Sequence, residues 1–71
     1  MNQGLRLRIK LLKSGCTAKA FAKALGISRS ALYRRLNGKV PFTIGEVERT
    51  VTALGLTKQE RDEIFFNREV S

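Results

Sequence analysis

The sequence predicts an all-α domain of five short helices that spans residues 1–71. Potential N-cap residues and glycines alternate along the chain, and the apolar residues between them recur at helical spacing. The chain has one cysteine and no histidine, so neither an internal disulfide nor a Cys/His zinc site can replace helix packing. A core of this size stabilises a domain by only about 3–5 kcal/mol.

Residues 5–12, LRLRIKLL, fit two kinds of structure. Aliphatic and basic residues alternate through position 11, as in a half-buried strand. However, Leu5, Ile9 and Leu12 also fall at i, i+4 and i+7, on one face of a helix.

We favour the helix, from about Gln3 to Ser14, with Asn2 as N-cap and Gly15 as stop. A single strand would have no partner elsewhere in the chain. In the alternative, two chains pair through this strand as a ribbon-helix-helix dimer, which binds DNA through the strand.

Residues 17–38 predict two helices joined by a tight turn. Thr17 can cap a helix over 18–25, Gly26 suits the left-handed position that ends it, and Ser28 can cap the next helix. Ile27 is placed as an apolar plug between the helices. This pattern is typical of a helix-turn-helix, whose short turn holds the second helix at a steep angle to the first.

The two helices have distinct inner faces. In the first, Phe21, Ala22 and Leu25 face inward, and the small Ala22 suits the point where the helices cross. In the second, Leu32 and Leu36 form an i, i+4 core pair. Gly38 ends this helix.

Two more helices are predicted by reciprocal capping boxes, Thr43 with Glu46 and Thr57 with Glu60. Phe42, before the first box, is expected to enter the core. The fourth helix should bury a stripe, which consists of Ile44, Val47, Val51 and Leu54.

The fifth helix, over about 58–67, carries three adjacent apolar residues, Ile64, Phe65 and Phe66, which cannot all face one core. With Val70, they are candidates for a two-fold dimer interface. The competing interpretation is that both phenylalanines are core residues that cover the first helix.

The net charge of +8 is unevenly distributed. Residues 1–39 contain ten Lys or Arg and no acid, whereas residues 40–71 contain four basic and all six acidic residues. Because solvated surfaces normally mix both signs, the first half is interpreted as a surface that binds a polyanion.

The outward face of the third helix is the candidate surface for reading DNA bases. Its members are Arg29, Ser30, Tyr33 and Arg34. Arginine can donate two hydrogen bonds to guanine in the major groove. Neighbouring residues are better placed to hold phosphates, which position a protein without reading sequence. These are Thr17, Lys19, Lys23, Arg35, Asn37 and Lys39.

The run AFAKALGISRSALYRRLNGK, followed by TIGEV, LGLT and IFF, resembles the lambda-repressor-like, Cro-type (XRE) helix-turn-helix family of phage and bacterial regulators. The resemblance covers nearly the whole chain. It implies a homodimeric repressor that inserts its third helix into the major groove of an operator in double-stranded DNA, as in a Cro-like or short phage repressor.

By the same resemblance, Arg29, Ser30 and Arg34 match base-reading positions. Ala18 stands where many members have a phosphate-contacting glutamine, which leaves that contact to Thr17 or Lys19.

An alternative function is that of a modulator or antirepressor, which would hold a second regulator protein through IFF and the basic face. Enzymatic function is not expected, since histidine and phosphate-binding glycine loops are absent from the sequence. No metal or other cofactor is expected. No apolar stretch has the length of a membrane span, and a location in the cytoplasm of a bacterial host cell is expected.

Overall fold

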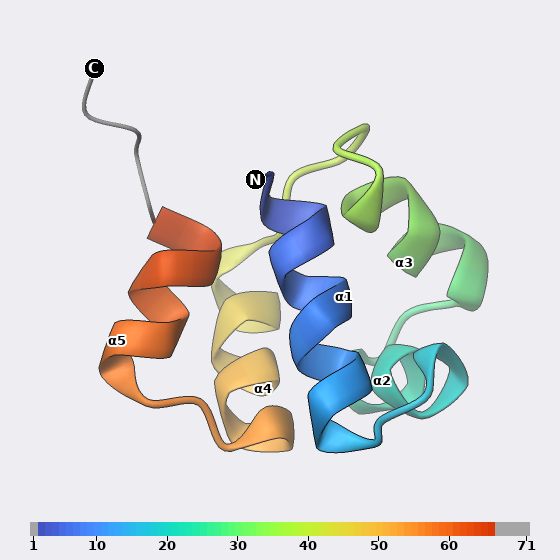
Figure 1. Cartoon of the computed structure of the whole chain (residues 1–71). Helices are drawn as coiled ribbons and strands as arrows, with labels where there is room; N and C mark the ends of the chain where they lie inside the picture. The colour runs from blue at the N-terminus through green and yellow to red at the C-terminus, as the bar shows by residue number, and fades with distance from the viewer. Residues whose placement is uncertain (1, 67–71) are drawn as a thin grey trace.

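The computed structural model describes residues 2–66, and within them all regular structure is helical (Figure 1). The elements are α1 (Gln3–Ser14), α2 (Ala18–Leu25), α3 (Arg29–Leu36), α4 (Ile44–Leu54) and α5 (Lys58–Arg61), which continues as the π-helical η1 (Asp62–Phe66). The all-α prediction is confirmed. The strand alternative for residues 5–12 is wrong, because these residues lie within α1.

Side-chain caps define where the helices begin. The Asn2 carboxamide accepts from the Leu5 amide at 2.8 Å, and both predicted capping boxes are complete. Gly15 ends α1 at φ 67°, a left-handed conformation that other residues rarely adopt. The boundaries of the first four helices therefore follow from local chemistry.

Helix α1 crosses the front of the molecule, with α3 on one side and the C-terminal helix on the other (Figure 1). Its core face consists of Gly4, Leu7 and Leu11. The face predicted from Leu5, Ile9 and Leu12 is a different one, which is mostly turned away from the core. Leu12 is 83% exposed and Leu5 is 45% exposed. The helix was therefore predicted correctly, but the face that it buries was not.

Gly4 allows α1 to approach α3 closely. A β-carbon built at this position would lie 1.8 Å from the carbonyl oxygen of Leu36, the last residue of α3. Only glycine fits this crossing without a shift of the backbone.

The predicted stripe of α4 is wrong at one end. Ile44 is 69% exposed, whereas Glu46, Val47 and Thr50 are the buried residues of this helix. Thr50 is buried at no cost in unsatisfied polar groups, since its hydroxyl donates to the Glu46 carbonyl at 2.8 Å. The ion pair of Glu46 with α3 (described below) accounts for this orientation.

The C-terminal helix differs from the prediction because it changes to π-helical turns at Asp62. Ile64 enters the core, and Phe65 packs edge-on against Phe42, with ring centroids 5.4 Å apart. Phe42 thus contacts the core, as predicted. The predicted end at residue 67 and the candidate interface residue Val70 lie outside the described residues.

Candidate nucleic-acid interface

The turn between α2 and α3 is held by its caps. The Thr17 hydroxyl accepts from the Ala20 amide and the Ser28 hydroxyl from the Ala31 amide, each at 3.1 Å. Gly26 adopts φ 72°, and the Ile27 amide donates to the Ala22 carbonyl at 3.0 Å. Both N-caps and the glycine stop were predicted.

Packing fixes the orientation of the two helices. Phe21, Ala22 and Leu25 are buried on α2, and Leu32 and Leu36 are buried on α3, as predicted. Ile27 packs partly buried against this core from the turn. Helix α1 packs against α3, and α4 packs against α2, so each helix of the pair is held in place by another helix.

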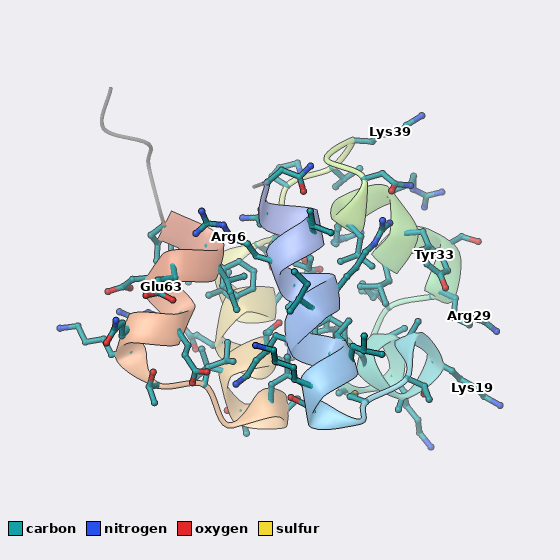
Figure 2. The ribbon with its side chains drawn as sticks, in the orientation of Figure 1. Arg6, Lys19, Arg29, Tyr33, Lys39 and Glu63 are labelled. Carbon is teal, nitrogen blue, oxygen red and sulfur yellow. The ribbon has the colours of Figure 1, made fainter. Side chains whose placement is uncertain are left out.

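All four predicted base-reading residues are exposed on α3: Arg29, Ser30, Tyr33 and Arg34. Among the described residues, no carboxylate forms an ion pair with either arginine. Figure 2 shows Arg29 and Tyr33 along one edge of the molecule, between Lys19 and Lys39. The edge is therefore positively charged, with hydrogen-bond donors that are not used by the fold.

Five of the six predicted phosphate-binding residues are also exposed. They are Thr17, Lys19, Lys23, Asn37 and Lys39. Thr17 and Asn37 have structural bonds as well, since Thr17 caps α2 and the Asn37 side-chain oxygen accepts from Arg8 Nη2 at 2.8 Å.

Arg35 does not lie with this group. Its Nε donates to Glu46 Oε1 at 2.8 Å, its Nη1 donates to the Ala31 carbonyl at 3.1 Å, and its side chain is 15% exposed. The structure therefore uses Arg35 to join α3 to α4. The sequence prediction that it binds phosphate assumed an outward side chain, which the ion pair prevents.

The electrostatics of Glu46 reflect this pair. Burial by itself would raise its pKa, but the hydrogen bonds from Arg35 and from the Thr43 amide outweigh burial and lower the pKa below the ordinary 4.5. The carboxylate stays charged and completes both the capping box and the link to α3. Its role in the capping box was predicted, whereas its pairing with Arg35 was not.

Arg8 was also missed. It projects from α1 to the C-terminal end of α3, where it is exposed beside Asn37. Its place in the alternating basic run gave no indication of this position, because the crossing of α1 over α3 depends on Gly4.

The predicted dimer residues are separated by the fold. Ile64 is a core residue and Phe65 is partly buried, so neither is available as predicted. Phe66 is 51% exposed, with the Arg61 guanidinium 5.8 Å from its ring centroid. Of the IFF surface that the modulator alternative required, only Phe66 remains exposed.

No group of three potential metal ligands occurs within residues 2–66. None of the helices in this part of the chain is long and apolar enough to cross a membrane.

A capped helix pair with a buried inner face and a basic outer edge defines a helix-turn-helix DNA-binding domain. The family model described as a helix-turn-helix domain matches residues 4–64, and the chain belongs to this family. The domain implies DNA binding, and such domains are typically not enzymes. Comparisons with curated proteins and with solved structures gave no match.

Proposed function

We propose that this chain is a sequence-specific transcriptional regulator that places α3 in the major groove of double-stranded DNA. The outward face of α3 is the observation that carries the proposal. Arg29 and Arg34 lie five positions apart on this face, exposed and without a carboxylate partner in residues 2–66. Paired hydrogen bonds from arginine to guanine discriminate between bases by about 1–3 kcal/mol each. Ser30 and Tyr33 would contact neighbouring base edges.

Phosphate contacts are assigned to the exposed residues around this face. Lys19 and Lys23 flank it from α2, and Asn37 and Lys39 flank it from the loop after α3. Thr17 can donate its hydroxyl proton to a phosphate while its oxygen caps α2. Arg35 is not included because its charge is paired with Glu46.

We further propose a homodimer on a palindromic operator, as in Cro-like repressors of phages and bacteria. Phe66 and Ile44 are the large apolar side chains that support a two-fold interface. Each is exposed and lies one or two positions along the chain from a member of the Phe42–Phe65 contact. Such a dimer would repress by competing with polymerase for the promoter. It would act in the bacterial cytoplasm, and neither catalysis nor a cofactor has a part in this function.

The proposal is tested by selecting binding sites from randomised duplexes and measuring affinity by gel shift. Arg34→Ala should cost about 1–3 kcal/mol on the selected site and relax the preference at one position. Lys39→Ala should weaken all sequences alike and reduce the salt slope by about 1. Lys58→Ala, an exposed lysine on α5, is the matched control and should have the smallest effect. Recovery of no consensus, or equal losses with all three variants, would contradict the proposal.

A further inference from the structure

Helix α1 has two separate apolar faces. Gly4, Leu7 and Leu11 face the core, whereas Leu5 and Leu12 lie in solvent and Ile9 between them is half-buried. A helix that is apolar on both sides is normally covered on both sides. Within the described structure Leu5 and Leu12 are left exposed on this outer face, which we call the α1 stripe (Leu5, Ile9 and Leu12).

The charges that α1 itself places beside the stripe are all basic, whereas Glu60 and Glu63 lie across the adjoining groove on the C-terminal helix. Every charged residue of α1 is basic, and the helix has no acid. Arg8 donates to the neutral amide of Asn37, so that bond leaves its charge uncompensated. Lys13, next to Leu12, is exposed and has no carboxylate partner in the described residues. An apolar stripe with basic borders selects an acidic amphipathic partner.

A groove adjoins the stripe. It has a volume of about 390 Å³ and runs between α1 and the C-terminal helix, with Ile9 and Ile64 among its lining residues. Lys10 and Glu60 also line it, and they pair with each other across it at 2.5 Å. Because Ile9 belongs to both the stripe and the groove, side chains of a bound helix could enter the groove while its backbone follows α1.

We propose that the α1 stripe and this groove bind an acidic amphipathic helix of another protein. A second copy of this chain fits less well, because pairing two α1 helices would oppose Arg8 and Lys13 with basic residues. A membrane surface is planar and would not use the groove, and the stripe has no aromatic residue of the kind that anchors interfacial helices.

The α1 stripe lies apart from the base-reading residues of α3, and Arg8 at its border reaches Asn37, a proposed phosphate contact. Lys19, Arg29, Tyr33 and Lys39 lie along one edge in Figure 2, whereas α1 crosses the front of the molecule. The proposed partner can therefore bind to a DNA-bound protein, and its binding does not depend on the proposed regulatory role. If the chain is a regulator, the partner would belong to the apparatus that it recruits or is controlled by.

The test uses ¹⁵N-labelled full-length protein and a helical peptide with leucines at i, i+4 and i+7 flanked by glutamates. We expect saturable chemical-shift changes in residues 5–13 and around Ile64, both with and without saturating duplex DNA. A peptide with lysines in place of the glutamates should bind at least about tenfold more weakly. If the shifts instead map to residues 28–39, or if DNA displaces the peptide, the acidic peptide is a DNA mimic and the proposal is wrong.

Two variants within the site and one control variant outside it test the proposal. Leu12→Ser should weaken peptide binding about tenfold without unfolding the domain, since its side chain is 83% exposed. Ala53→Ser changes an exposed residue of α4 that belongs to neither proposed interface, and it should leave peptide affinity unchanged. Lys13→Glu should also weaken binding. Equal effects of Leu12→Ser and Ala53→Ser would overturn the proposal. The proposal would also be overturned if sedimentation showed that Leu12→Ser no longer self-associates. The same holds if the wild type, but not Leu12→Ser, bound to phosphatidylserine vesicles.

Discussion

Gly4→Ala should destabilise the domain, although alanine is the better helix former. At a solvent-exposed helical position, replacing glycine with alanine raises stability by up to about 1 kcal/mol. Here the new β-carbon would lie 1.8 Å from the Leu36 carbonyl oxygen, whereas a carbon–oxygen contact is tolerated only near about 3.3 Å. The helices must separate by more than about 1 Å, and the obstacle is backbone that cannot rotate away. Overpacking of this kind costs about 1–3 kcal/mol, and we take the upper end.

The free energy of unfolding should then fall by about 2 kcal/mol, which is roughly half of the total for a domain of this size. With a urea m-value of about 1 kcal/mol/M, the unfolding midpoint measured by circular dichroism should fall by about 2 M. Gly45→Ala is the matched control. A β-carbon there meets nothing closer than Arg49 Nη1 at 3.9 Å, so the midpoint should stay or rise slightly. Equal or greater stability of Gly4→Ala would refute the close crossing of α1 over α3.

Three further predictions concern the core and the ion pairs. Leu32→Ala, at a fully buried side chain of α3, should cost about 2–5 kcal/mol and leave little folded protein by circular dichroism. Arg35→Met should lower stability in urea but leave the salt slope of DNA binding unchanged, because Arg35 pairs with Glu46. A salt slope reduced by about 1 would instead show that Arg35 contacts a phosphate, as the sequence predicted. The hydrogen bond from Lys10 lowers the pKa of Glu60 from 4.5 to about 2, and the pKa of Glu46 is also lowered. These two carboxylates therefore stabilise the folded state fully above about pH 4.5, and this stabilisation is lost as the pH falls toward about 2. Acid titration of Glu60→Gln should show a shallower fall over that range, and an unchanged profile would argue against the pair.

Helix boundaries were predictable because each is set by a few adjacent residues. Thr17, Ser28, Thr43 and Thr57 all cap the helices that their positions predicted. A hydroxyl that accepts an amide proton three residues later needs no information from the rest of the chain. The turn between α2 and α3, and with it the position of the proposed reading edge, follows from the same local chemistry.

The orientation of α1 and α4 was not predictable in the same way. Leu5, Ile9 and Leu12 have helical spacing, but Gly4, Leu7 and Leu11 have it too, and only the close contact at Gly4 decides which set faces α3. In α4, the choice against Ile44 depends on a pairing of Glu46 with a residue eleven positions earlier. Spacing predicts that a helix has an apolar face, whereas long-range contacts decide which face is buried when two are available.

In α3, the core residues and the proposed base-reading residues are different. The core uses Leu32 and Leu36, and the exposed reading face is built from other positions. Arg35 lies between these sets and holds the helix to α4 through Glu46, so α3 is fixed without any bond from its outward arginines. Exposed side chains without fold contacts change stability by little when substituted. If Arg29 and Arg34 read bases as proposed, substitutions there should therefore change the preferred DNA sequence while the urea midpoint stays constant. A new sequence specificity could then evolve without a compensating change in the core.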